Sequence, residues 1–155
     1  MDAKDVTFDF EEVPGPGRLT KDLPISLAGG KATLIPRTDG VLAINIQPSY
    51  SPWLEGRCLQ FSKAGTVAAD FSFDIELDKG VKEIECGMRV ILHTGTCSVL
   101  LFDRQGNLID AIDPPSKGGQ EPYWFNCGSP STPIKKITMR FRATGYWEID
   151  NLSVG

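Results

Sequence analysis

The 155-residue chain carries a formal net charge of -4, with 16 Lys and Arg residues against 20 Asp and Glu residues. The basic residues are scattered and form no stripe that could follow a phosphate backbone, so we expect no nucleic-acid partner. The longest apolar runs, such as Val90–Leu92 and Val99–Phe102, are far shorter than the ~18–20 residues of a membrane-spanning helix. We therefore expect no membrane insertion. The length fits one core, and we predict a single domain over residues 1–155.

The N-terminus lacks the positively charged start and apolar stretch of a secretory signal. The chain as written is therefore not expected to direct its own export; the alternative is one module of a larger extracellular or cell-surface protein. The four cysteines contain no CxxC pair and His93 is the only histidine, which argues against structural zinc. We expect buried free thiols, with disulfides in an exported parent as the alternative. The cysteines are Cys58, Cys86, Cys97 and Cys127.

Short strand patterns fill the first half of the chain. Val6–Phe10 alternates apolar and polar residues, which predicts a half-buried strand before the breakers Pro14–Gly17. Ile25–Ile35 is interrupted by Gly29-Gly30 and predicts one or two strands, and Val41–Ile46 predicts another.

An irregular segment at Pro48–Pro52 follows and is expected to present Tyr50 and Trp53. Cys58–Ser62 predicts a short strand, and Val67–Leu77 predicts the longest strand, with a buried side. The residues expected on that buried side are Phe71, Phe73, Ile75 and Leu77.

Turn signals divide the second half into further strands. Asp78–Gly80 and His93–Thr96 are both predicted to reverse the chain, and Asp103–Asn107 fits a hairpin loop whose glycine adopts positive φ. Two prolines and two glycines make residues 113–120 a surface loop. The strands expected between these turns are Val81–Leu92, Cys97–Phe102, Leu108–Ile112 and Tyr123–Cys127.

The closing stretch, Ile137–Val154, has the clearest pattern. Alternation from Ile137 to Ala143 predicts a strand, and Thr144-Gly145 predicts a tight turn after it. A second alternation of apolar residues starts at Trp147 and Ile149. After Asp150-Asn151 the apolar positions are shifted by one residue, which predicts a β-bulge there. The alternative is a solvated acid in a turn. The residues that follow the phase slip are Leu152 and Val154.

Helical spacing of apolar residues is absent, and strand patterns recur every ~8–12 residues, as in β-sandwiches. We therefore predict an all-β fold, a two-sheet antiparallel jelly-roll β-sandwich. The segments VTFDFEE, SVLLFDRQGNLIDAI and IKKITMRFRATGYWEIDNLSV resemble those of bacterial jelly-roll modules related to carbohydrate-binding modules and galactose-binding-like domains, which close with an "IDN" strand. The resemblance implies a non-catalytic module of a larger surface protein.

The same resemblance implies a structural calcium ion where the first and last strands meet. Carried over by position, its ligands are Glu11 and Asp150, with Glu12 as an alternative to Glu11. Carboxylate and carbonyl oxygens are the ligands that Ca²⁺ prefers. The alternative is a pair of surface acids at strand ends.

The sequence contains no clear catalytic pattern. His93 is the only histidine and lies in an expected turn, so a nucleophile beside a base would require a Cys97–His93 pair across that turn. Acids at alternating positions are typical of the solvent face of a sheet rather than of a glycosidase pair. We therefore predict that the chain is not an enzyme. These acids are Asp70, Asp74, Glu76, Glu83 and Glu85.

Tyrosine and tryptophan pairs beside loops are the positive functional signal. Exposed aromatic rings offer flat apolar faces on which sugar rings can stack, whereas Trp147 alternates with Ile149 and fits the core better. We predict a carbohydrate-binding, lectin-like module with a glycan partner. The alternative is a structural or protein-interaction domain of a larger surface, adhesin or phage-type assembly, with a surface protein as partner and no small ligand. The predicted ligand contacts are Trp53, Tyr50, Trp124 and Tyr123.

Overall fold

A computed structural model describes residues 6–8, 10, 17–38, 42–46, 53–54, 57–63, 69–115, 121–129 and 131–155. These residues form strands almost throughout, and the helical element among them is a 3-10 turn, η1 (Ala28–Gly30). No helix in this part of the chain is long and apolar enough to span a membrane. The strands are β1 (Val6–Phe8), β2 (Gly17–Arg18), β3 (Ile25–Leu27), β4 (Ala32–Pro36), β5 (Leu42–Ile46), β6 (Arg57–Lys63), β7 (Ala69–Val81), β8 (Glu83–Phe102), β9 (Leu108–Ile112), β10 (Tyr123–Gly128) and β11 (Ile134–Val154).

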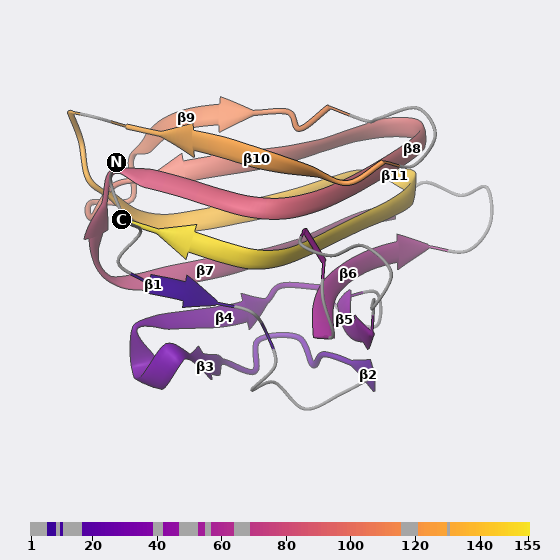
Figure 1. The fold of residues 1–155 in the computed structure, drawn as a ribbon, viewed down its shortest axis with the longest axis horizontal. Helices are drawn as coiled ribbons and strands as arrows, with labels where there is room; N and C mark the ends of the chain where they lie inside the picture. The colour runs from indigo at the N-terminus through magenta and orange to yellow at the C-terminus, as the bar shows by residue number, and fades with distance from the viewer. Residues whose placement is uncertain are drawn as a thin grey trace.

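Two antiparallel sheets pack face to face and share the long strands β8 and β11 (Figure 1). In the first sheet, the order is β9, the second half of β8, the first half of β11, β7, β4 and β3. In the second sheet, β10 pairs with the first half of β8, and the second half of β11 pairs with β8, β6 and β1, with β5 and β2 beyond β6. The predicted all-β, two-sheet antiparallel sandwich is confirmed.

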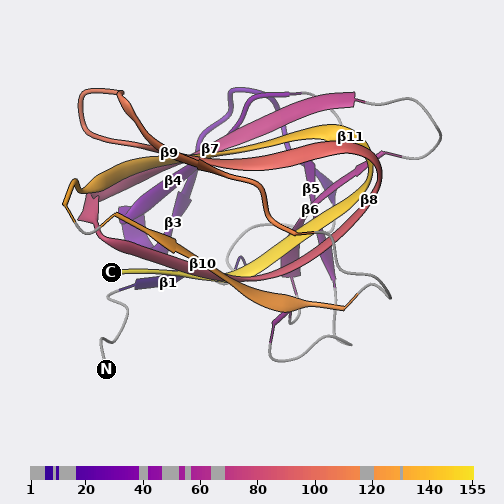
Figure 2. The same cartoon turned by 90° about the horizontal axis from the view of Figure 1, so that it is seen from above.

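The two long strands bend together where they pass from one sheet to the other, and Figure 2 shows both curving around the same end of the molecule. Gly95, with φ of 89°, faces Ala143 across the ladder, and the register between β8 and β11 shifts at Thr144/Gly145. The predicted chain reversals at His93–Thr96 and Thr144-Gly145 are therefore wrong. Each glycine marks a corner inside a continuous strand, because the neighbouring strand bends beside it and keeps the ladder paired.

The predicted turn at Asp78–Gly80 is also displaced. Strand β7 continues to Val81, which pairs with Ile134 at the start of β11, and the chain bends at Lys82 instead. The ladder extends through the expected turn because β11 supplies a pairing partner there.

The core lies between the two sheets and is built from the alternating apolar residues of the long strands. Phe71 and Phe141 are register partners, and their rings stack with centroids 5.0 Å apart. Trp147 is fully buried, as predicted. The residues expected on the buried side of β7 all lie in this core, namely Phe71, Phe73, Ile75 and Leu77.

Several local predictions are confirmed. The glycine pair at 29–30 lies in η1 and separates β3 from β4. The hairpin between β8 and β9 turns at Gly106, whose φ is 84°. The register between β8 and β11 shifts between Asp150 and Ser153, and Asn151 adopts φ of 50°, so the predicted β-bulge is present.

Candidate functional site

The outer face of the second sheet carries the candidate site. Along the first half of β8, alternate residues point into the core, so the intervening residues point outward. Gly87 is one of the outward positions, and its register partners are Trp124 on β10 and Asp150 on β11. Directly opposed residues of antiparallel strands share a face, so these residues form one row across three strands. We call this surface the Trp124 face, comprising Trp124, Gly87, Arg89, Glu148 and Asp150.

Trp53 lies directly over the centre of this row. A Cβ atom at residue 87 would overlap the carbonyl oxygen of Trp53 and would lie only 2.8 Å from its Cα. The side-chain amide of Asn151 donates a hydrogen bond to the same carbonyl at 3.2 Å. Gly87 therefore permits the close approach of the Trp53 backbone, which the bulge residue Asn151 then anchors.

An ion pair is buried next to the row. Arg89 and Glu148 are register partners, and the guanidinium Nε and terminal nitrogen of Arg89 contact the same carboxylate oxygen of Glu148. Their side chains are only 10 % and 0 % exposed, although they lie on the outer face of the sheet. Because a buried charge is stable only when it is paired, each of these groups fixes the other in place.

The third charged group of the face is Asp150. It is fully buried, and one of its carboxylate oxygens accepts a hydrogen bond from the backbone N–H of Asn151 at 2.8 Å. The bulge thus aims a carboxylate at the row beneath Trp53, as the phase slip in the sequence predicts. Charged residues are seldom fully buried unless they are paired, so this part of the outer face is covered rather than solvated.

The aromatic side of the face is accessible. Trp124 is 41 % exposed on the edge strand β10, and Trp53 is half-buried. Asn126 follows two residues after Trp124, so it points to the same side, and it is exposed. An exposed indole ring beside an exposed amide can stack on a flat apolar ring while the amide bonds its substituents.

Tyr123 does not join Trp124 on the outer face of the sheet. Tyr123 pairs with Met88, points to the core side of β10 and donates a hydrogen bond from its hydroxyl to the carbonyl of Pro115 at 2.6 Å. Burial raises the pKa of this phenol. The structure thus gives Tyr123 a packing role, whereas Tyr50 lies outside the described residues.

Of the predicted calcium ligands, the structure describes Asp150. Strand β1 pairs with the end of β11, with Phe8 opposite Leu152. Glu11 and the alternative Glu12 lie outside the described residues. Among the residues that are described, no three His, Cys, Asp or Glu side chains come together as a metal site. The calcium site remains a prediction in which Asp150 is the one described ligand.

The cysteines are free, as predicted, and those at 58, 86 and 97 are buried, whereas Cys127 is half-buried. Burial raises the pKa of the Cys97 thiol to about 12 and that of Cys127 to about 11. Both therefore remain thiols at neutral pH, and the thiol is not the nucleophilic form. His93 lies within β8 rather than in a turn, and its side chain is outside the described part of the structure.

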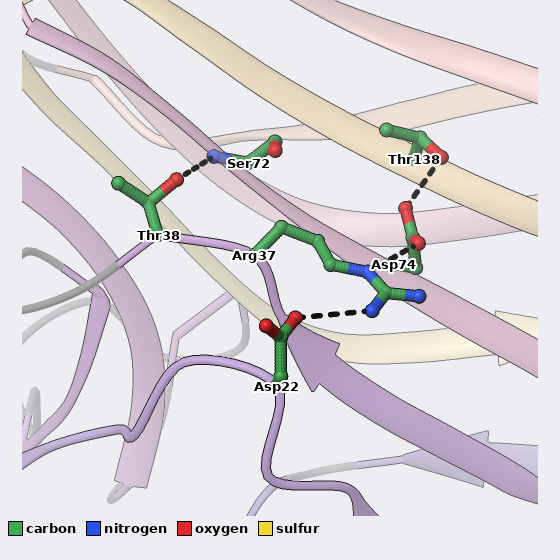
Figure 3. Close-up of polar contacts among 6 residues, drawn as sticks. All are labelled: Asp22, Arg37, Thr38, Ser72, Asp74 and Thr138. Carbon is green, nitrogen blue, oxygen red and sulfur yellow. Dashed lines mark hydrogen bonds and ion pairs between the residues drawn. The ribbon is translucent and has the colours of Figure 1, made fainter.

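A second polar network lies on the outer face of the other sheet (Figure 3). Arg37 donates hydrogen bonds to Asp74 at 2.9 Å and to Asp22 at 3.1 Å, and these bonds raise the pKa of the guanidinium. Thr138 donates to the other oxygen of Asp74 at 2.7 Å. Asp74 is therefore buried and paired rather than solvated as expected, and the network ties the segment before β3 to β7 and β11.

Sequence reasoning found Trp53, Trp124 and Asp150 as separate candidates but missed Arg89, Glu148 and Gly87. The glycine carried a usable signal, because a glycine in the polar phase of a strand often marks the close approach of another backbone. The Arg89–Glu148 ion pair has no recognisable sequence signal, since its formation depends on the register of β8 against β11.

Comparisons with known proteins support the fold. No protein-family model and no curated protein matches the sequence. Among solved structures, the K2 cleaved adhesin domain of Lys-gingipain matches with a TM-score of 0.59 and 13% identity over 97% of both chains. TmCBM61, solved in complex with β-1,4-galactotriose, matches with a TM-score of 0.52 and 16% identity over 80% of this chain and 87% of its own.

Larger proteins match over only part of their length. The chain spans 30% of an arabinose-bound MgGH51 α-L-arabinofuranosidase, with a TM-score of 0.53 and 15% identity over 98% of this chain. It spans 19% of a bacteriophage CBA120 tailspike protein, with a TM-score of 0.49 and 19% identity over 81% of this chain. At these identities, the likenesses to the gingipain adhesin domain, TmCBM61 and the arabinofuranosidase show a shared fold and no more.

Proposed function

We propose that the protein is a non-catalytic carbohydrate-binding module that holds an oligosaccharide on the Trp124 face. The observation that carries the proposal is the row in which exposed Trp124, Gly87 beneath the Trp53 backbone, and buried Asp150 lie side by side. Tryptophan is well suited to stack on the C–H face of a sugar ring, and the exposed amide of Asn126 on the same side of β10 can bond the hydroxyls.

The rigidity of the face supports this role. Trp124 is on a strand paired to β8, and the charged groups next to it are held by the β8–β11 ladder and by the Arg89–Glu148 ion pair. Sites built on strands hold their geometry more closely than sites on loops, so a ligand would meet preorganised contacts. The likeness of the fold to TmCBM61, whose structure contains β-1,4-galactotriose, adds support for a neutral oligosaccharide as the ligand.

Isothermal titration calorimetry with β-1,4-galactotriose and a panel of neutral oligosaccharides tests the proposal. We expect Trp124→Ala to weaken binding by about tenfold to a hundredfold, as expected for the loss of roughly 1.5–3 kcal/mol of apolar contact. The matched control is Leu108→Ala, which truncates an apolar residue 56% exposed on β9. Equal affinity of Trp124→Ala and wild type would refute the site.

The alternative function is a protein-interaction domain without a small ligand. The observation that favours it is the likeness to the gingipain adhesin domain, which extends over 97% of both chains. Absence of binding across a broad glycan array, with protein whose unfolding transition shows that it is folded, would favour this alternative over the glycan-binding module.

A further inference from the structure

A cleft separate from the Trp124 face lies where three segments meet at one end of the sandwich. Its cavity of about 400 Å³ is lined by the end of β7, the β8–β9 loop and the residues that lead into β11. Figure 2 shows the β8–β9 connection and the start of β11 at the same end of the molecule. A second cavity of about 320 Å³ shares Asp103, Arg104 and Lys135 with the first, so the two adjoin, and we call them together the cleft. Volumes of this size accommodate small ligands.

The walls of the cleft are held in place. A Cβ atom at Gly80 would lie 2.5 Å from Cβ of Pro133, so the glycine lets the proline pack closely against it, and both residues line the cleft. In the β8–β9 loop, one oxygen of Asp103 accepts hydrogen bonds from the backbone N–H groups of Gln105 and Asn107, both at 2.9 Å. Arg104 lies between these anchored residues, and its exposed side chain borders the cleft.

The charge of the cleft opposes that of the protein. Four cationic residues line it, against three acidic residues, in a chain whose formal net charge is -4. One of the acids, Asp103, already accepts the hydrogen bonds of its own loop. Lys135 is positioned by donating to the carbonyl of Asp78 at 2.8 Å, and the ammonium of Lys136 lies 4.6 Å from the centre of the Phe102 ring. The cationic residues are Lys79, Arg104, Lys135 and Lys136.

We propose that this cleft binds a carboxylate-bearing sugar, such as a uronate residue of an acidic oligosaccharide. Arg104 supplies the planar donor that pairs with a carboxylate, and Lys135 supplies a second positive charge next to it. Gln105 and Thr132 line the same cavity and can bond sugar hydroxyls. The inference adds a second site with a different ligand class, and it stands independently of the Trp124 face.

The test is calorimetric titration of the full chain with trigalacturonate. We expect binding that weakens about tenfold or more in Arg104→Ala and in Lys135→Ala, because each variant removes a charge-assisted hydrogen bond. Affinity is also expected to fall with added salt. The matched control is Lys21→Ala, which removes an exposed positive charge elsewhere on the surface and should leave binding unchanged.

Three results would overturn the inference: no binding of trigalacturonate, equal affinity of Arg104→Ala and wild type, or equally effective competition by inorganic sulfate, which would reveal a general anion site. Trp124→Ala separates the two sites. It should abolish or weaken binding of neutral oligosaccharides while trigalacturonate still binds, so failure of either proposal is visible without the other.

Discussion

Replacing the buried ion pair by apolar residues offers the sharpest test of how the Trp124 face is built. Arg89→Met or Glu148→Leu alone leaves the remaining charge in a site where the side chains are at most 10 % exposed. Breaking such a pair costs about 3–5 kcal/mol, whereas replacing both partners is often neutral. Because a whole domain is stable by only about 5–15 kcal/mol, either single variant should be markedly weakened.

Urea unfolding, followed by the fluorescence of the buried Trp147, gives the free energy of unfolding of the wild type, the two single variants and the double variant. These four values complete a double-mutant cycle. We expect the double variant Arg89→Met with Glu148→Leu to be more stable than either single variant. If the double variant instead loses the sum of the two single losses, the groups do not interact and the argument is wrong. A stable double variant also provides the material for asking whether the charges contribute to glycan binding.

Three further predictions follow from single positions. Gly87→Ala should displace the Trp53 backbone, lower the free energy of unfolding by about 1–3 kcal/mol and weaken glycan binding; unchanged calorimetry would contradict the close approach. Folding raises the pKa of Cys97 from 9.0 to about 12, so above pH 9 the unfolded chain binds fewer protons than the folded chain. Stability should therefore fall as pH rises from 9 to 12, less steeply in Cys97→Val; equal slopes in urea unfolding would refute this. The proposed calcium site predicts a midpoint of thermal unfolding that rises with calcium, falls with EDTA and responds to neither in Asp150→Asn; an unresponsive wild type would exclude a stabilising calcium ion.

Local sequence patterns were sufficient wherever the structure depends on neighbours in the chain. The alternation of Phe71 and Phe73 placed the buried side of β7, and the phase slip after Ile149 located the bulge at Asp150. The same reasoning failed at Gly95 and Gly145. A glycine near polar residues is compatible both with a reversal and with a bend, and the choice depends on whether a distant strand bends alongside.

In the candidate site, too, some features follow from local sequence and others only from the pairing of distant strands. Trp53 and Trp124 could be singled out because exposed indoles near loops are chemically informative. Trp124 lies beside Gly87 because β10 pairs with β8, the Trp53 backbone lies on the same glycine, and the burial of Arg89 depends on the pairing of β8 with β11. These pairings join residues far apart in the sequence, so composition and spacing within one segment contain no record of them.

The long strand β8 explains how the two proposed binding surfaces can coexist on one small sandwich. Its first half carries Gly87 and Arg89 in the second sheet, and its second half, in the first sheet, ends at Phe102 beside the loop that supplies Arg104 to the cleft. The core residues between these points are fixed by pairing with β11 on both sides of the corner. Changes in the exposed residues of either surface therefore need not disturb the other, which is why single variants at Trp124 and Arg104 should affect different ligands.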